Sequence, residues 1–431
     1  MKRYVFKWSA VLSLLVISVL CVYLYSNLSV TNPTTPTPST PVIGAPQEDN
    51  KGSGIVRTEF PKAPLFSPFS GCDFLLPLSG SGDDVVFELH SFGGNLYAVG
   101  ETNSRDYDFC VNGSSVFVAK LSVNGTLQSL TTIEGRYLHS KLAPFGVSVL
   151  SACSTGTIFT VFDFDLNVTA TTTVTGDSFG MTVLTQTGLS FVSTPSSTLI
   201  SYAPDTHRFS SLSLPSKIQN VVGVEYIGTK LIILANTDSL PVIVTVEEGV
   251  CHAVSITSVQ SIQSAIPYFD KELGFVISGI YDGISTVCAV SCRGEVAWLK
   301  RFFQAEKTSL VPISDGYLFF ASLSTSSTCI RLCSHGDVVE NCVLSFTNLF
   351  PCQYLVDKNV TLLLSSSEYE KSVVATYSVA DGANLKFEFD VTPRSFINFG
   401  GGLTLALCSD KKSGNFASGV GAMDSFILRL R

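Results

Sequence analysis

Residues 96–127 read LYAVGETNSRDYDFCVNGSSVFVAKLSVNGTL, and this stretch carries the pattern that decides the fold. A short apolar run is followed by a small polar loop and then by a second apolar run. The pattern occurs eight times, and its first apolar runs begin 51, 42, 42, 42, 44, 43 and 43 residues apart. They begin at Leu96, Val147, Leu189, Leu231, Leu273, Tyr317, Val360 and Leu403. A fixed period of roughly 40–50 residues built from short strands predicts a β-propeller.

The first unit divides into four predicted strands, at 85–92, 95–101, 115–122 and 126–133. Asn124-Gly125, between the last two strands, is a strong hairpin signal. The eighth unit stops at its third strand, and a spare strand-like run, CDFLLPL at 72–78, precedes the first unit. In a closed ring this run would supply the missing outer strand of the last blade and remove an open sheet edge. We therefore predict an all-β propeller of eight four-stranded blades closed by an N-terminal strand, with seven blades as the alternative.

Units one and eight also resemble a known repeat family. YAVGETNSRDYDF (97–109), SSVFVAKLSVNGTL (114–127) and GAMDSFILRLR (421–431) are similar to the repeats of SBBP-type propellers with seven or eight blades. Those repeats read roughly V-x-G-x-T-x-S-x-D-F, a loop, then D-x-F-V-x-K-x-x-x-x-G. The likeness covers unit one and the second half of unit eight, and elsewhere it is limited to the apolar skeleton. Because the family has no single activity, the resemblance implies a fold and no function.

The first 25 residues differ in kind from the repeats. Residues 1–7 carry Lys2, Arg3 and Lys7, and residues 8–25 form an uncharged apolar stretch of 18 residues. That length is just sufficient to span a bilayer, and the preceding positive charge predicts a cytoplasmic N-terminus. We therefore predict a single-pass type II signal-anchor that places the propeller outside the cell or in the secretory lumen. The alternative is a cleaved signal peptide and a secreted protein.

A stalk is predicted between this segment and the repeats. Residues 31–46 read TNPTTPTPSTPVIGAP, and a run so rich in Thr and Pro favours an extended chain. A plain disordered linker is the alternative. The predicted division is thus a basic cytoplasmic segment at 1–7, a transmembrane segment at 8–25, a stalk at 26–70 and a propeller at 71–431.

Export would allow glycosylation and disulfide formation. Asn-x-Ser/Thr sequons of the propeller region lie at Asn112, Asn124, Asn167 and Asn359, and a further one lies at Asn27. A two-residue turn at His335-Gly336 would place Cys329 opposite Cys342, which makes this pair a disulfide candidate. The alternative for most of the 12 cysteines is a free thiol buried in the β core.

Composition and motifs argue against several function classes. The chain has 27 basic and 35 acidic residues, and no basic stripe follows the N-terminus, so we expect no nucleic-acid partner. It has no Cys-x-x-Cys and only scattered histidines, so we expect no zinc site. GDSFG at 176–180 matches the nucleophile elbow of hydrolases, but no helical pattern follows it as that motif requires.

The longest loop of the first unit is the candidate binding site. It reads ETNSRDYD at 101–108, and the matching loop of unit eight reads SDKKSGN at 409–415. Because ring closure makes these units neighbours, we predict a binding rim for a carbohydrate or protein ligand. Its residues are Arg105, Asp106, Tyr107, Asp108, Asp410 and Lys411. The alternative is a pair of solvated loops that cap the closure. Ca²⁺ at these aspartates has weak support, because their spacing matches no known calcium loop; no other cofactor or metal is predicted.

Three functional hypotheses follow from these observations. The first is a membrane-tethered recognition module without catalysis, in which His90 and His139 lie on inner strands as core or channel residues. The second is a carbohydrate-active enzyme at the central channel, which would require two carboxylates converging at the channel mouth. The third is a purely structural surface protein. We favour the first hypothesis, because no catalytic constellation is visible in the sequence.

Overall fold

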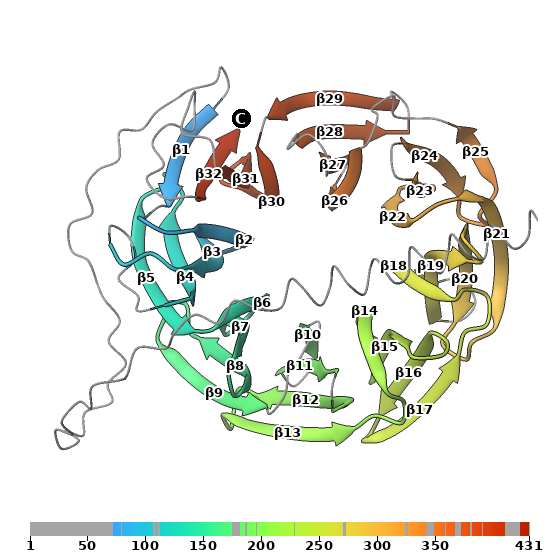
Figure 1. Cartoon of the computed structure of the whole chain (residues 1–431), viewed down its shortest axis with the longest axis horizontal. Helices are drawn as coiled ribbons and strands as arrows, with labels where there is room; N and C mark the ends of the chain where they lie inside the picture. Colours follow the sequence, from blue (N-terminus) through green and yellow to red (C-terminus); the bar gives the residue numbers. More distant parts are fainter. Residues whose placement is uncertain are drawn as a thin grey trace, which may run out of the picture. The chain divides into compact units, whose positions relative to one another are not determined.

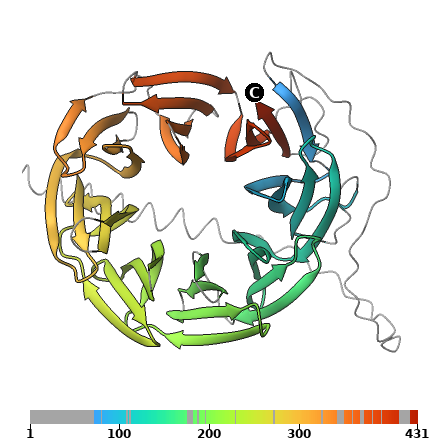
Figure 2. The same cartoon turned by 180° about the vertical axis from the view of Figure 1, so that it is seen from behind.

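Eight four-stranded antiparallel sheets make up the regular structure of this protein. The computed structural model describes residues 72–430 of a unit that runs from Gly52 to Arg431. Within 72–430 the description has gaps at 79, 107–108, 110–112, 175–181, 186–187, 195, 228, 270–272, 324–325, 342–348, 358, 367–371, 380–381, 390 and 410–422. The sheets follow one another around a central channel as the blades of a propeller (Figures 1 and 2).

The first four blades follow chain order. Blade 1 comprises β2 (Asp84–Phe92), β3 (Asn95–Thr102), β4 (Ser115–Ser122) and β5 (Leu127–Glu134). Blade 2 comprises β6 (Arg136–Ala143), β7 (Gly146–Cys153), β8 (Gly156–Phe162) and β9 (Val168–Val174). Blade 3 comprises β10 (Thr182–Thr185), β11 (Gly188–Ser193), β12 (Thr198–Ala203) and β13 (Arg208–Ser213). Blade 4 comprises β14 (Ile218–Ile227), β15 (Lys230–Thr237), β16 (Val242–Glu247) and β17 (Val250–Ser255).

The last four blades complete the ring. Blade 5 comprises β18 (Ser261–Phe269), β19 (Leu273–Tyr281), β20 (Ile284–Ser291) and β21 (Val296–Gln304). Blade 6 comprises β22 (Lys307–Ile313), β23 (Gly316–Leu323), β24 (Ser326–Cys333) and β25 (Val338–Asn341). Blade 7 comprises β26 (Leu349–Val356), β27 (Val360–Ser366), β28 (Ser372–Ser378) and β29 (Gly382–Phe389). Blade 8 comprises β30 (Thr392–Phe399), β31 (Gly402–Ser409), β32 (Asp424–Leu430) and, at its outer edge, β1 (Cys72–Leu78).

The repeated apolar runs of the sequence are the second and third strands of the blades. The six residues of β11 are all buried, as are the first six of β7, whereas the outer strands β5 and β9 alternate between exposed and half-buried positions. A strand covered on both faces reads as a continuous apolar run, and a strand covered on one face alternates. The predicted strands of unit one agree with β2 to β5 within one residue at each end.

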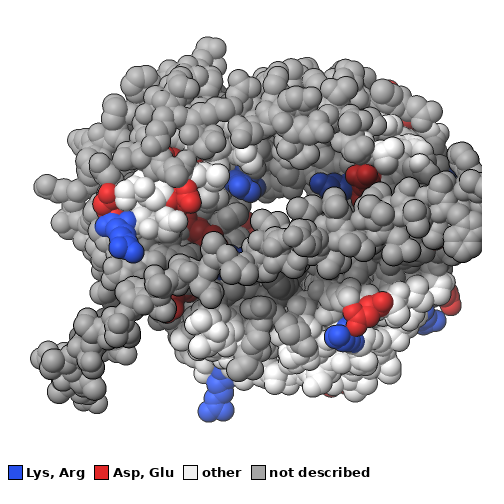
Figure 3. All heavy atoms as spheres, in the orientation of Figure 1, with Lys and Arg blue, Asp and Glu red and all other residues white. Residues whose placement is uncertain are grey.

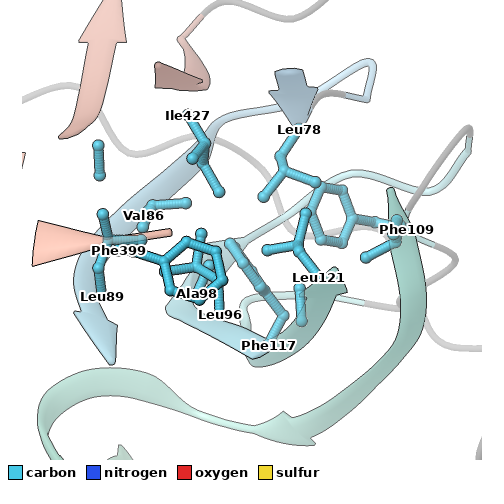
Figure 4. Close-up of a cluster of buried hydrophobic side chains, with 13 residues drawn as sticks. Leu78, Val86, Leu89, Leu96, Ala98, Phe109, Phe117, Leu121, Phe399 and Ile427 are labelled. Atoms are coloured by element: carbon cyan, nitrogen blue, oxygen red, sulfur yellow. The ribbon is translucent and has the colours of Figure 1, made fainter. Parts of the chain in front are cut away.

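The core consists of eight clusters of buried apolar side chains, and each cluster joins two neighbouring blades. Figure 4 shows the cluster between blades 8 and 1, where Leu78 of β1 and Ile427 of β32 face Val86 and Phe117 of blade 1. Every blade therefore depends on both of its neighbours for the burial of its apolar surface, and this burial is the main stabilising contribution to the ring.

The predicted closure of the ring is confirmed. β1 pairs antiparallel with β32, with Leu76 opposite Ile427 and Leu78 opposite Ser425. The fold therefore has eight blades, and the seven-blade alternative is wrong. A parallel bridge between Asp83 and Met423 and a hydrogen bond from Val86 N to Ser425 Oγ (2.6 Å) tie blade 8 to the start of blade 1.

A buried carboxyl group lies beside this closure. The Asp84 side chain is fully buried, and its two oxygens accept hydrogen bonds from Thr102 Oγ1 (2.5 Å) and Ser104 Oγ (2.9 Å). Burial raises the pKa of Asp84 to about 6, with a smaller contribution from the nearby Asp424 carboxylate, and the hydroxyl hydrogen bonds only partly offset this rise. Ring closure thus places a carboxyl group where its charged form is disfavoured.

The fold prediction needs one correction. It included an N-terminal transmembrane helix. The described residues contain no helix, so none of them forms a helix long and apolar enough to cross a membrane. The 8–25 stretch was assigned from hydropathy alone, which measures apolar content and does not establish a helix. The predicted segments 1–7, 8–25 and 26–70 lie outside the described residues.

Candidate ligand site in the central channel

A cavity of about 580 Å³ opens on the inner wall of the channel. Four inner strands, β2, β6, β26 and β30, line it, so it spans blades 7, 8, 1 and 2. Figure 3 shows basic and acidic side chains next to the central opening on the face that it presents. The lining residues are Phe87, Glu88, Leu89, His90, His139, Ser140, Lys141, Leu142, Cys352, Gln353, Arg394 and Ser395. The volume lies in the range typical of small-ligand sites.

β-Bulges bring several of these side chains to the wall. The pairing register shifts at Phe87 in β2, at Leu138 in β6, at Cys352 in β26 and at Arg394 in β30. Each bulge places an extra residue in the inner strand, which bends the strand and re-aims its side chains. Three of these four bulged residues line the cavity.

In blades 7, 8 and 1, the residue after the bulge contacts the next blade. Gln353 of blade 7 accepts a hydrogen bond from Phe396 N (2.7 Å) and donates one to Phe396 O (3.1 Å) in blade 8. Ser395 of blade 8 accepts one from Leu89 N (3.2 Å) in blade 1. Glu88 occupies the corresponding position in blade 1 and contacts blade 2. These side chains satisfy buried backbone groups between blades and at the same time form part of the cavity wall.

Glu88 is the centre of a polar network. Ser140 Oγ donates a hydrogen bond to Glu88 Oε2 (2.6 Å), and the Ser140 oxygen also lies 2.8 Å from His90 Nε2 and 3.3 Å from Tyr137 Oη. A hydroxyl group has one proton, and here Glu88 receives it, so His90 Nε2 and Tyr137 Oη must be donors to the Ser140 oxygen. The second imidazole, that of His139, has its Nε2 atom 4.0 Å from Glu88 Oε1.

The network fixes the protonation states of its members. Burial alone would raise the pKa of Glu88, but the His90 imidazole 3.4 Å away, the charges of the two histidines when protonated and the hydrogen bond from Ser140 lower it to about 2. Burial lowers the pKa of His139, so its ring is neutral at pH 7. The hydrogen bond from Ser140 does not depend on the charge of the histidines, and it keeps the Glu88 carboxylate ionised. Burial also raises the pKa of Tyr137 well above its ordinary value, with Glu88 contributing, so the phenol stays a donor.

A stack of three flat groups borders this network. The Phe87 and Tyr137 rings are parallel, with centroids 4.9 Å apart, and Arg394 Cζ lies 5.5 Å from the Phe87 centroid. Phe87 is therefore in contact with both an aromatic ring and a guanidinium. Lys141 of β6 is the second cationic side chain at the cavity.

The cysteine in the wall is not arranged as a nucleophile. Cys352 is partly exposed, but its sulfur lies 3.2 Å from the Leu363 carbonyl oxygen, and burial of the thiol raises its pKa to about 11. A thiol with this pKa is protonated at neutral pH, and the thiolate is the reactive form. The Ser140 hydroxyl is likewise engaged, because it gives its proton to Glu88 and accepts two hydrogen bonds.

The two described residues of the predicted binding rim, Arg105 and Asp106, do not line this cavity. Arg105 is exposed, and Asp106 Oδ1 accepts a hydrogen bond from Ser81 N (2.7 Å), which fastens the loop to the segment between β1 and β2. Tyr107, Asp108, Asp410 and Lys411 lie outside the described residues, so the meeting of the two loops stays a prediction. No group of three or more metal-ligating side chains occurs among the described residues, and the Ca²⁺ prediction, which needs Asp108 and Asp410, is untested.

The modification sites also stay predictions. Asn124, Asn167 and Asn359 are exposed at turns, whereas Asn112 lies outside the described residues. Ile330 pairs with Asn341, as the register through His335-Gly336 predicts, and this register would place Cys329 opposite Cys342. Because Cys342 is not described, the disulfide is not tested.

Sequence reasoning located part of the channel site and missed the rest. His90 and His139 were placed on inner strands as channel or core residues, and both line the cavity. Glu88, Lys141 and Arg394 were not singled out, because each is an isolated charge in an apolar strand. Only 14% of the residues are charged, so a charged residue on a predicted inner strand is unusual. That contrast was the signal in the sequence that could have identified these three residues.

Comparisons with known proteins identify the fold. No family model and no curated protein sequence matches the chain. Among solved structures, BamB from Moraxella catarrhalis has a TM-score of 0.53 at 6% identity, covering 83% of this chain and 98% of its own. Dihydro-heme d1 dehydrogenase NirN in complex with DHE has a TM-score of 0.51 at 10% identity, covering 77% and 75%. The similar structures are β-propeller proteins, and at these identities the likeness shows the β-propeller fold alone.

Proposed function

We propose that this protein is a recognition module that binds a protein ligand at the channel cavity and catalyses no reaction. The observation that carries the proposal is the network around Glu88. In this network the Glu88 carboxylate and the Ser140 hydroxyl are used for contacts between blades. Two cations and an apolar surface remain at the cavity. The SBBP-type repeat relationship of units one and eight is part of the same proposal and concerns the fold only.

Two features favour recognition over glycoside chemistry. Hydrolysis of a glycosidic bond normally requires a pair of carboxyl groups at a set separation, and Glu88 is the only carboxyl among the described lining residues. The base nearest to the Ser140 hydroxyl is Glu88, and a carboxylate whose pKa is about 2 is a poor general base at neutral pH.

A protein ligand is favoured over a carbohydrate by the aromatic groups. Sugar rings commonly stack on a free aromatic face, and Phe87, the aromatic lining residue, already contacts Tyr137 and Arg394. Propellers commonly serve as protein-binding scaffolds, and a charged cavity on rigid strands suits that use.

The test is ligand capture by the full-length protein on a peptide array and a glycan array of defined composition. We expect spots on the peptide array that disappear with Cys352→Trp, because the indole of this partly exposed lining residue occupies the cavity. Cys153→Trp, at the end of β7 and away from the cavity, is the matched control and should leave the spots unchanged.

Three outcomes would contradict the proposal. Spots restricted to the glycan array would exclude a protein ligand, and spots that survive Cys352→Trp would place the ligand elsewhere. Cleavage of chromogenic glycosides that is lost in Glu88→Gln would favour the enzyme alternative. Melting temperatures of all variants establish that the ring is intact in each.

A further inference from the structure

We infer that the channel cavity binds a carboxylate that is adjacent to an amide N–H and an apolar side chain, which is the chemistry of an N-acyl amino acid or a polypeptide C-terminus. This inference rests on the proposed function and names the ligand group recognised at the same site. It is carried by three observations: two cations with no ion-pair partner among the described residues, a guanidinium that lies over an aromatic ring, and a buried ring nitrogen without a hydrogen bond.

The charge at the cavity favours an anion. Lys141 and Arg394 both line it, and neither lies within ion-pair distance of a carboxylate of the described residues. The Glu88 carboxylate is engaged by Ser140 and His90 and so belongs to the wall. Glu225 of β14 is the acidic neighbour of Lys141; burial raises its pKa and the ammonium only partly offsets the rise. A ligand anion would therefore gain from both cations.

The orientation of Arg394 suits a carboxylate. The guanidinium lies over the Phe87 ring, which is itself stacked on Tyr137. It has five N–H donors, and the Cys408 thiol engages only part of them. A guanidinium with free edges binds a carboxylate through two parallel hydrogen bonds, which a single ammonium group cannot do. Because the contact with Phe87 restrains the Arg394 side chain in advance, less side-chain entropy is lost when the ligand binds.

An unsatisfied atom specifies the second ligand group. His139 Nδ1 is buried and has no hydrogen-bond partner. The Glu88 carboxylate, 4.0 Å from Nε2, favours the tautomer that has its proton on Nε2, and in this tautomer Nδ1 of the neutral ring is an acceptor. A buried acceptor without a donor is costly, and a ligand N–H would satisfy it. An amide N–H next to a carboxylate is the arrangement at the last residue of a polypeptide, and Leu89 and Leu142 offer apolar surface for that residue's side chain.

Matched probes test the inference on the full-length protein by calorimetry or ligand-observed NMR. N-acetyl-L-leucine carries both groups, N-acetyl-L-leucinamide lacks the carboxylate, and 4-methylpentanoate lacks the N–H. We expect the first to bind about 10-fold or more tightly than the second, and several-fold more tightly than the third, because a charge-assisted hydrogen bond is worth more than a neutral one. A hexapeptide ending in leucine, as free acid and as amide, distinguishes the two sources: tighter binding of the peptide acid than of N-acetyl-L-leucine indicates a chain end.

Variants connect the binding to the named residues. Arg394→Gln should weaken binding of N-acetyl-L-leucine about 10-fold or more, and Lys141→Gln several-fold. Arg301→Gln is the matched control, since the Arg301 guanidinium also lies over an aromatic ring, that of Tyr281 at 4.7 Å, but on the outer strand β21. It should leave the affinity unchanged. His139→Phe should abolish the advantage of N-acetyl-L-leucine over 4-methylpentanoate while preserving the effect of the carboxylate.

The inference is overturned if acid and amide bind equally, if Arg394→Gln has no effect, or if no acid binds at concentrations to about 10 mM. If any of these results is found while the peptide-array spots still disappear with Cys352→Trp, the recognition function stands. Only the proposed ligand chemistry is then wrong. Array spots that ignore Cys352→Trp reject the site itself, whatever the carboxylate result.

Discussion

At the residue scale, Glu88 shows how one carboxyl group serves stability and site together. The Glu88 oxygens contact His90 of blade 1 and Ser140 of blade 2. Because Glu88 is charged, the Ser140 hydroxyl points its proton toward the carboxylate. If Glu88 were protonated, it would lose the acceptor that orders Ser140, His90 and Tyr137. The charge of Glu88 therefore fixes the shape of the cavity wall next to Phe87 and His139.

The pH dependence of stability tests this role. The folded-state pKa of about 2 lies below the ordinary value of 4.5, so the stabilisation is present above 4.5 and is lost as the pH falls toward 2. With allowance for solvent screening, the loss should be about 1–3 kcal/mol in the free energy of unfolding. Chemical denaturation of Glu88→Gln from pH 5 to 2 should show a flatter profile, with the exposed Glu134→Gln as control. An unchanged slope in Glu88→Gln would contradict the network.

At the element scale, the inner strands explain why the site was only partly predictable. Period-2 alternation assigns side chains to faces, and a bulge shifts that assignment by one residue for the rest of the strand. No residue type at Phe87 or Arg394 marks a bulge in advance. Ser140 lies 52 residues from Glu88, so only the folded ring brings the two together. By contrast, the strand count and the turn at Asn124-Gly125 depend on local signals and were predictable.

Side-chain clamps between neighbouring blades give the second prediction. Asn236 Oδ1 accepts a hydrogen bond from Ile262 N (2.8 Å), and its Nδ2 donates to Ile262 O (2.9 Å) in the next blade. Asn236→Ala leaves both backbone groups of a buried residue without partners, which should cost about 2–4 kcal/mol. Urea denaturation measures the loss, and Asn398→Ala, an exposed position on β30, should change stability by less than about 0.5 kcal/mol. Equal effects would show that the clamp is unimportant.

At the scale of the whole molecule, ring closure makes the last blade depend on both ends of the described chain. The spare run at 72–78 predicted this, because a blade with three strands leaves an open edge that only a distant strand can cover. The sequence did not predict that closure would bury Asp84 near Asp424, since each is an ordinary acidic residue at the start of a strand.

Closure gives the third prediction. The pKa of Asp84 is raised from 3.8 to about 6, so the folded state binds more protons and stability falls as the pH rises through this interval. The fall should be about 2–3 kcal/mol. Asp84→Asn, which keeps the shape and one acceptor, should abolish this part of the pH dependence between pH 4 and 7, as measured by thermal or urea denaturation. A variant as pH-sensitive as the wild type would show that Asp84 is ionised without penalty.

The pairing of β1 with β32 also constrains the biosynthesis of the protein. β32 begins about 350 residues after β1 ends, so at about 5–20 residues per second the ribosome completes it roughly 20–70 s after β1. During that interval the nascent chain can fold blades 1 to 7, but β1 has an unpaired edge and Leu78 lacks the partners that bury it. Blade 8 is therefore the last to form, and the first described strand must be protected from aggregation until translation is nearly complete.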